Sequence, residues 1–322
     1  MPKQFNLTIK AQSKNIPAPS LATWITATNG VDHTKAWNSV CYGNGLFVAR
    51  ATTAFLMTSP DGVNWTNREP VPAGTCQSVC YGKGMFVSVC SAGTFRVIIS
   101  YDGINWEGIP TLAGTGGEQT TDGTWSSVCY GKDKFVAVSS ATTTTAGTLN
   151  TMTSEDGENW TSRDVLALRG FKSVCYSKNQ ELFVAVGTAG AVMTSKDGIS
   201  WIQRTAGEAN VWNSVCYAED KQLFVAVSQA GTNRIMTSPN GITWTARAAP
   251  QANAWQSVCY GNGMFVAVST AGTNRVITSP NGITWTLRTA SAATSWAGIG
   301  YGEGRFVALA SSTTGNRVMY SS

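Results

Sequence analysis

Trp255-Gln-Ser-Val-Cys-Tyr260 begins a stretch of sequence that carries most of the information on the architecture. The chain continues through Gly261-Asn-Gly263, Met264-Phe-Val-Ala-Val268 and Arg275-Val-Ile-Thr-Ser279, and then through Pro280-Asn-Gly282 to Ile283-Thr-Trp-Thr-Leu-Arg288. Runs rich in Val, Thr, Phe, Tyr and Trp are typical of short β-strands. The two Asn-Gly segments predict tight hairpin connections, because Asn and Gly accept the positive φ of tight reversals. This stretch therefore predicts four antiparallel strands.

The same phrase recurs along the chain. Six of the eight cysteines stand at the same place in this phrase, 39–49 residues apart: Cys41, Cys80, Cys129, Cys175, Cys216 and Cys259. In a seventh copy, Gly300 takes the place of the cysteine. A period in the low forties is the signature of a repeat architecture. Seven copies of four strands predict an all-β, seven-bladed β-propeller with almost no helix. An open solenoid is the alternative, but it would need polar caps at both ends.

The two ends of the chain predict how the ring closes. The seventh copy stops after a third strand at Arg317–Ser322, and residues 18–28 align with the missing fourth strand. Sharing a blade between the termini removes the exposed sheet edges that favour aggregation. We therefore predict an N-terminal arm at 1–17 and one propeller domain at 18–322. The blades are expected at approximately 37–68, 76–108, 125–163, 171–204, 212–247, 255–288 and 296–322.

The composition excludes several functional classes. Of 322 residues, 13% are charged, the net charge is +5 without a basic run, and His33 is the single histidine. A thin positive charge lacks the footprint of nucleic-acid binding, and one histidine excludes multi-histidine metal centres. We expect no cofactor and no metal site. The sequence also shows no apolar run of about 18 residues and no secretory signal pattern.

The turn between the predicted third and fourth strands carries a family resemblance. It reads Ser59-Pro-Asp61-Gly-Val-Asn-Trp65 in the first copy, and its acidic or amide position recurs at Asp61, Asp102, Asp156, Asp197, Asn240 and Asn281. The pattern resembles the Asp-box (BNR-like) repeat of sialidase-type propellers. Its Asp–Gly spacing is one residue shorter than the usual box, and two copies have Asn. The resemblance implies a propeller in which this turn is structural and lies opposite the sialidase active face.

The resemblance also raises a glycoside hydrolase as an alternative. A sialidase-like site would need three arginines that clamp a carboxylate, a Tyr–Glu pair and a further acid. The arginines here recur in register with the repeat, notably Arg234, Arg275 and Arg317, and several acids belong to the turns. We therefore predict a protein that is not an enzyme and has no catalytic residues.

The cysteines are predicted to be small buried hydrophobes between blades, since equivalent positions on neighbouring blades are too far apart for disulfides. One pair differs. If Gly82-Lys-Gly84 forms a three-residue hairpin loop, Cys76 faces Cys90. A reduced, unbridged pair is the default expectation, and a disulfide in an oxidising setting is the alternative.

The face that carries the second-to-third strand loops and the inter-blade loops is the predicted binding face, because irregular loops on a rigid scaffold often bind ligands. We name it the upper face, and we name the opposite face, which carries the first-to-second and third-to-fourth strand turns, the lower face. Its candidate residues are Trp37, Trp125, Trp212, Trp255, Trp296, Arg234, Arg275, Arg317, Thr143 and Thr144. Tryptophan can stack on sugars, but a residue repeated in nearly every blade more often packs blade against blade. Both interpretations stay open here.

The N-terminal arm has an alternating apolar edge of Phe5, Leu7 and Ile9 that can add to a partner as a strand, and packing of the arm onto its own blade is the alternative. Low-charge repeats of this kind resemble propellers of bacteriophage tail and head-decoration proteins. The resemblance implies a virion structural protein made in the host cytoplasm, attached by its arm and lower face to other virion proteins, with host-surface or glycan binding above. The alternatives are a soluble multivalent lectin, cytoplasmic if cellular, and a sialidase-like hydrolase.

Overall fold

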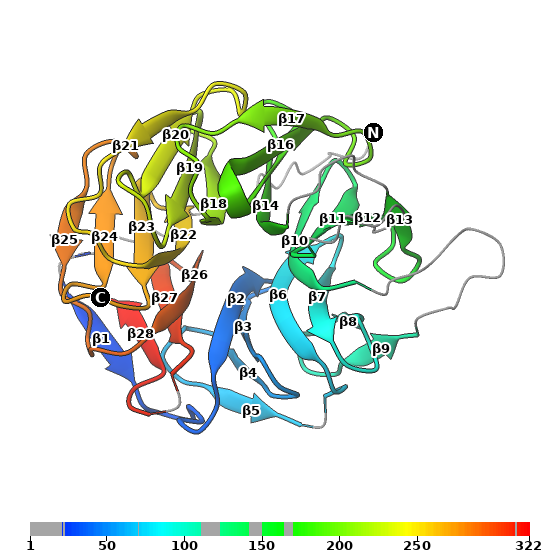
Figure 1. Cartoon of the computed structure of the whole chain (residues 1–322). Coiled ribbons are helices and arrows are strands. Elements are labelled where there is room, and N and C mark those ends of the chain that lie inside the picture. Colours follow the sequence, from blue (N-terminus) through cyan, green and yellow to red (C-terminus); the bar gives the residue numbers. More distant parts are fainter. Residues whose placement is uncertain are drawn as a thin grey trace, which may run out of the picture.

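The computed structural model describes residues 21, 23–69, 71–110, 123–141, 150–163, 170–312 and 314–322. Seven four-stranded antiparallel sheets stand as blades around a central axis (Figure 1). Apart from the short 3-10 turn η1 (Thr188–Gly190), the regular elements in the described ranges are all strands. The predicted all-β, seven-bladed propeller is confirmed.

The first four blades follow the chain order. Blade 1 contains β2 (Trp37–Gly43), β3 (Leu46–Ala51), β4 (Leu56–Ser59) and β5 (Thr66–Arg68). Blade 2 contains β6 (Thr75–Gly82), β7 (Met85–Ala92), β8 (Val97–Ser100) and β9 (Glu107–Ile109). Blade 3 contains β10 (Trp125–Gly131), β11 (Lys134–Ser139), β12 (Thr151–Ser154) and β13 (Thr161–Arg163). Blade 4 contains β14 (Phe171–Ser177), β15 (Leu182–Gly187), β16 (Ala191–Ser195) and β17 (Ile202–Thr205).

The remaining blades complete the ring. Blade 5 contains β18 (Trp212–Ala218), β19 (Leu223–Ser228), β20 (Ile235–Ser238) and β21 (Thr245–Arg247). Blade 6 contains β22 (Trp255–Gly261), β23 (Met264–Ser269), β24 (Val276–Ser279) and β25 (Thr286–Arg288). Blade 7 contains β26 (Trp296–Gly302), β27 (Arg305–Ala310), β28 (Val318–Ser321) and β1 (Trp24–Ala27).

The ring closes as predicted, by a strand from the N-terminal part of the chain. β1 is the outer strand of blade 7 and pairs antiparallel with β28, from Trp24 opposite Ser321 to Ala27 opposite Val318. Trp24 and Ala27 are buried, so the closing strand is held by side-chain packing as well as by the ladder. In Figure 1, blue β1 accordingly lies beside red β28.

The hydrophobic core is divided among the seven contacts between neighbouring blades, which we call seams. Each seam holds one cluster of buried apolar residues. At the seam of blades 5 and 6, Trp255 at the start of an inner strand packs with Val227 from the second strand of the preceding blade. We call the position of Trp255 in each blade the entry residue. The seams stabilise the fold because burial of apolar surface is the largest favourable contribution to folding.

A β-bulge follows the entry residue in every blade. In blade 6, Trp255 pairs with Ser269 and Ser257 pairs with Val268, so Gln256 is an extra residue between two pairs. The same register shift occurs in the other six blades. A bulge redirects a side chain from the regular alternation of a strand. Here it leaves one residue per blade close to the central axis, at the upper end of the inner strand.

Parts of the sequence-based predictions fall outside the described residues: Phe5, Leu7 and Ile9 of the arm, and Thr143 and Thr144 of the blade 3 insertion. Within the described residues, no helix has both the length and the apolar character that a membrane-spanning helix needs.

Candidate functional site

A hollow of about 500 Å³ opens at the upper end of the central channel. Its lining includes the extra residue of each of the seven bulges, which we name the mouth ring: Asn38, Gln77, Ser126, Lys172, Asn213, Gln256 and Ala297. Four of these side chains are carboxamides and one is a hydroxyl, so the ring offers both donors and acceptors of hydrogen bonds. The site therefore offers polar groups to a ligand from six of the seven blades.

Hydrogen bonds to the next blade hold several mouth-ring side chains in place. The amide of Asn38 donates to the carbonyl oxygen of Cys76 at 3.0 Å, and that of Asn213 donates to Trp255 at 3.1 Å. The hydroxyl of Ser126 donates to the carbonyl of Phe171 at 2.7 Å. In each case the acceptor is the entry residue of the following blade. The ring is thus fixed by the propeller scaffold, which suits a preformed binding site.

A layer of serines supports the mouth ring. Five of the six serines that lie one position further along the inner strand accept a hydrogen bond from a valine N–H of the next blade. The Val79 N–H donates to Ser39 at 3.0 Å, and four further seams repeat this bond at 3.1–3.2 Å. Blade 7 has Gly298 at this position, where a side chain would meet the carbonyl of Asn38. The layer therefore joins the inner strands into a rigid collar.

The charge of the mouth is uneven. Among the described residues that line the hollow, Lys172 alone carries a charge, and its side chain is exposed. Blade 7 contributes Ala297, which leaves one side of the ring without a polar group. The site is therefore neutral and polar over most of its lining, with a single cation on blade 4 that favours a ligand bearing one negative group.

Of the two interpretations of the repeated tryptophans, packing between blades agrees with the structure and stacking on a ligand does not. Five entry residues have no exposed surface: Trp37, Trp125, Trp212, Trp255 and Trp296. The indole N–H of Trp255 donates to the carbonyl of Gln251 at 3.2 Å, so even its polar atom is used inside the protein. A fully buried indole presents no face to a sugar. These residues pack the seams, and the neighbouring bulge residues take the place that the sequence suggested for them.

The periodic arginines also hold the scaffold. Arg234 donates to the carbonyls of Gly231, Ala252 and Asn253, which ties the β19–β20 loop to the connection that enters blade 6. Arg275 closes its own loop by donating to Gly272 and Thr270. Arg317 is fully buried and donates to Ser312 and Thr314. These guanidinium groups are thus engaged with backbone carbonyls and a hydroxyl within the scaffold.

The six repeated thiols are half-buried, and each contacts a seam cluster, which agrees with the prediction of small hydrophobes. Burial raises the pKa of all six well above the usual range of a thiol. They are therefore protonated at neutral pH and poor nucleophiles. Within the described residues, no three His, Cys, Asp or Glu side chains gather closely enough for a metal ion.

The turns between third and fourth strands are built by hydrogen bonds of their own side chains. In blade 1, Oδ1 of Asp61 accepts from the amides of Val63 and Asn64 at 2.9 and 2.8 Å, and the indole of Trp65 donates to Gly62. Burial alone would raise the pKa of Asp61, but the hydrogen bonds from Asn64, Val63 and Ser59 outweigh it and lower the pKa to about 2. Asn240 accepts the same two amide bonds in blade 5.

This chemistry predicts an acid-dependent part of the stability. A carboxylate with a lowered folded-state pKa stabilises the fold above its ordinary pKa of about 3.9, and that contribution is lost as the pH falls toward about 2. The pKa is lowered to about 2 at four turns: Asp61, Asp102, Asp156 and Asp197. Blades 5 and 6 already have Asn at this position. If all four aspartates are replaced by Asn, the melting temperature should decrease less between about pH 4 and pH 2 than that of the wild type.

Thermal unfolding followed by circular dichroism across that pH range measures the effect. Glu155→Gln is the matched control, because Glu155 is an exposed acid next to the turn of blade 3. The control should melt as the wild type does at every pH. An unchanged acid dependence in the fourfold Asn variant would contradict the role of these carboxylates.

Sequence reasoning missed the mouth ring. The signal was present, since the residue after the entry residue is polar in six of seven copies. A regular strand would turn that residue and its neighbours to alternate faces, and only the bulge brings it to the axis.

The comparisons with known proteins concern the fold. Residues 100–250 match the family model of the DUF6242 beta propeller domain. No curated protein sequence matches the chain. A streptogramin B lyase structure superposes with a TM-score of 0.76 at 9% identity, over 92% of this chain and 96% of that one. A catalytically inactive histidine variant of virginiamycin B lyase from Staphylococcus aureus, solved with quinupristin, superposes with a TM-score of 0.76 at 10% identity. The match covers 93% of this chain and 99% of that one.

Structures of YCF48 are also similar, with somewhat lower TM-scores. YCF48 from Cyanidioschyzon merolae has a TM-score of 0.68 at 13% identity, over 93% of this chain and 98% of that one. YCF48 bound to D1 peptide has a TM-score of 0.67 at 14% identity, over 93% and 94%. At these identities the likeness extends to the fold and no further. Together with the family match and the seven sheets, it identifies the chain as a seven-bladed β-propeller.

Proposed function

We propose that this chain is a binding propeller without catalytic machinery, and that it holds a carbohydrate with one acidic group at the mouth ring. The observation that carries the proposal is the 500 Å³ hollow lined by fixed amides and hydroxyls with Lys172 as its single charge. Carboxamides donate and accept in adjacent positions, which matches neighbouring sugar hydroxyls. The lysine ammonium supplies a charge-assisted hydrogen bond to a carboxylate.

Several observations support a non-catalytic role. The thiols have raised pKa values, the four aspartates whose pKa is lowered to about 2 are engaged in turns, and the periodic arginines are bonded within the scaffold. Virginiamycin B lyase, whose fold is similar, is catalytically inactive when one of its histidines is replaced by alanine. The single histidine of this chain, His33, lies in the connection between β1 and β2 and does not line the mouth.

The test is binding of an acidic oligosaccharide, such as one that carries a uronate, measured by isothermal titration calorimetry. Lys172→Ala should weaken binding by about ten-fold or more, as expected for the loss of a charge-assisted hydrogen bond. Lys196→Ala is the matched control, because Lys196 is exposed in a lower-face turn. The neutral version of the sugar should bind both proteins equally. If the two lysine variants bind the acidic sugar alike, the proposed site is wrong.

An extended peptide is the second candidate ligand, because a solved YCF48 propeller of similar fold is bound to a D1 peptide. Amide-lined hollows can bind backbone groups as well as sugar hydroxyls. A peptide array and a glycan array, probed with the same labelled protein, separate the two. Binding to peptides alone would replace the carbohydrate proposal, and turnover of a fluorogenic sialoside would replace both with a hydrolase.

We further propose that the propeller belongs to a bacteriophage particle, attached through residues 1–17 and its lower face. The resemblance of the repeats to virion propellers supports this role, and it leaves the upper mouth free for the host surface. Deletion of residues 1–17 should leave a folded propeller that no longer enters particles, as seen by gel analysis of purified virions. Normal incorporation of the shortened protein would contradict attachment through the arm.

A further inference from the structure

The seam between blades 1 and 2 is built differently from the other six. Elsewhere, a buried aromatic entry residue packs against Val or Leu of the preceding blade, as Trp255 does against Val227. In blade 2 the entry residue is Cys76, joined by a disulfide to Cys90, and the preceding blade presents Arg50 in the Val227 position. At this seam the large side chain therefore comes from the preceding blade, as Arg50, and the small one is the entry residue, Cys76.

The guanidinium of Arg50 takes over the role of the missing indole. Trp255 donates to the carbonyl four residues before it, at Gln251. Nη2 of Arg50 donates at 3.4 Å to the carbonyl of Pro72, four residues before Cys76. Arg50 is fully buried, and its guanidinium lies 6.0 Å from the centre of the Trp106 ring. The Arg50 side chain therefore occupies the space of an entry tryptophan and makes the equivalent hydrogen bond. Unlike tryptophan, it brings a positive charge into the seam.

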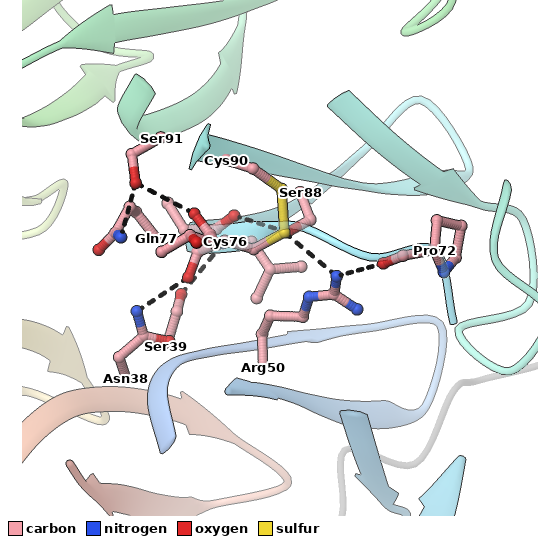
Figure 2. The surroundings of a disulfide bond; sticks show 12 residues. Asn38, Ser39, Arg50, Pro72, Cys76, Gln77, Ser88, Cys90 and Ser91 are labelled. Carbon is pink, nitrogen blue, oxygen red and sulfur yellow. Dashed lines mark hydrogen bonds between the residues drawn. A yellow bond between two sulfur atoms is a disulfide. The ribbon is translucent and has the colours of Figure 1, made fainter. Parts of the chain in front are cut away.

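That charge faces sulfur. Nη2 of Arg50 lies 3.1 Å from Sγ of Cys76, and Figure 2 shows the guanidinium directed at the disulfide. Nε and Nη1 are buried without a hydrogen-bond partner. In the described part of the chain, no carboxylate forms an ion pair with Arg50. A buried charge without a counter-charge is costly, so a state of this seam that supplied a negative group would be favoured.

We propose that Cys76–Cys90 is a redox-active disulfide that a dithiol reduces, and that the reduced state holds a Cys76 thiolate paired with Arg50. A nearby cation stabilises a thiolate, and a stabilised reduced form makes a disulfide easier to reduce. Arg50 is a positioning residue in this scheme. It acts on the sulfur of Cys76 and exchanges no electrons.

The reaction balances as two thiol–disulfide exchanges. A thiolate of the dithiol attacks Sγ of Cys90, the S–S bond breaks, and Cys76 leaves as a thiolate beside Arg50, since the sulfur with the lower pKa leaves faster. The second thiol of the reductant, as its thiolate, then displaces Cys90, which takes up a proton. The protein gains two electrons and one proton, and the dithiol becomes a cyclic disulfide with the release of one proton to solvent.

The surroundings indicate where the reductant enters and what it affects. Both cysteines are buried, and a side chain at Gly74 would lie 3.1 Å from Sγ of Cys90, so the 71–74 segment covers this sulfur with glycine. Displacement of this short connection gives access. The carbonyl of Cys76 accepts the amide of Asn38, a mouth-ring residue. Reduction is therefore expected to change the contact between Asn38 and Cys76 at the mouth ring and to leave the mouth-ring contacts of the other blades unchanged.

The other titratable or charged groups around the disulfide are few. Cys41 and Tyr81 are packed against the same cluster from β2 and β6, and Arg96 lies at the β7–β8 loop, where its carbonyl accepts the Cys90 N–H. Burial raises the pKa of the Cys41 thiol well above its usual range, so that thiol stays neutral. We accordingly assign the acid–base behaviour of the reduced pair to Cys76 with Arg50.

The test equilibrates the full-length protein in mixtures of reduced and oxidised dithiothreitol, traps free thiols and counts them by mass spectrometry. With a Cys76 thiolate, the equilibrium constant for reduction should rise about ten-fold per pH unit between about pH 6 and pH 8, because one proton is released. A dithiol product would give no pH dependence. A flat profile for the wild type overturns the proposal regardless of any variant.

Variants separate charge from packing. Arg50→Met keeps much of the volume without the charge, and should need at least about ten-fold more reductant at pH 8 and lose the pH dependence. Arg50→Lys keeps the charge and should keep the pH dependence. Arg317→Met is the control, because Arg317 is the other fully buried arginine in the described ranges and lies at blade 7. If Arg50→Met and the wild type have the same midpoint of reduction by dithiothreitol and the same slope of the equilibrium constant against pH, Arg50 only fills space.

Discussion

Removal of residues 1–27 is expected to open the ring, whereas removal of residues 1–17 leaves it closed. The longer deletion takes away all of β1, including the buried side chains of Trp24 and Ala27. Loss of a buried tryptophan alone costs about 3–5 kcal/mol. The unpaired edge of β28 would also be exposed, and such edges pair with other chains. We expect a lowered melting temperature and soluble aggregates, measured by differential scanning fluorimetry and by sedimentation velocity.

The shorter deletion is the matched control, because it ends before Leu21, which packs in the seam of blades 6 and 7. It should sediment as the full-length protein does and melt at the same temperature. A synthetic peptide of residues 18–28, added to the longer deletion, should restore part of the lost stability. A Δ1–27 protein that stays dispersed with an unchanged melting temperature would show that β1 is dispensable for closure.

The sequence predicted the architecture well because its signals are local and repeated. Each Asn-Gly or Asp-Gly turn specifies its own hairpin, and seven copies make the number of blades unambiguous. Closure followed from an incomplete last copy, since Arg317–Ser322 lacks a partner strand that residues 18–28 resemble. Neither inference needed long-range contacts.

The site was harder to predict because one bulge changes which residues face the axis. Sequence alternation drew attention to Trp255 and its equivalents, which are buried, and passed over Gln256 beside it. A shift of one residue exchanges the two faces of a strand, and a bulge is not visible in a hydrophobic pattern. Arg50 stands out in the sequence, because the other six repeats have Val or Leu at the same position. Its meaning depended on Cys76, which lies in the next blade.

The largest effect of a single substitution is expected for Trp255→Ala. Trp255 has no exposed surface and lies in the seam of blades 5 and 6 among Val227, Ile235 and Phe265. Truncation leaves a cavity and removes the indole hydrogen bond to Gln251, for a loss of about 3–5 kcal/mol in the free energy of unfolding. Guanidinium unfolding curves measure it, with the shift in midpoint converted through the wild-type slope.

Trp255→Phe separates volume from the hydrogen bond, and the chain itself shows that the exchange is tolerated. Blade 4 has Phe171 as its entry residue, buried to 1% exposure in the seam of blades 3 and 4. The phenylalanine variant should therefore lose about 1–2 kcal/mol, partly because the indole hydrogen bond to the carbonyl of Gln251 is lost, while the Asn253 N–H still donates to that carbonyl. A loss below about 1 kcal/mol for Trp255→Ala would mean that the seams stabilise the ring less than the strand ladders do. A loss of similar size for both variants would assign the effect to the hydrogen bond instead of the packing.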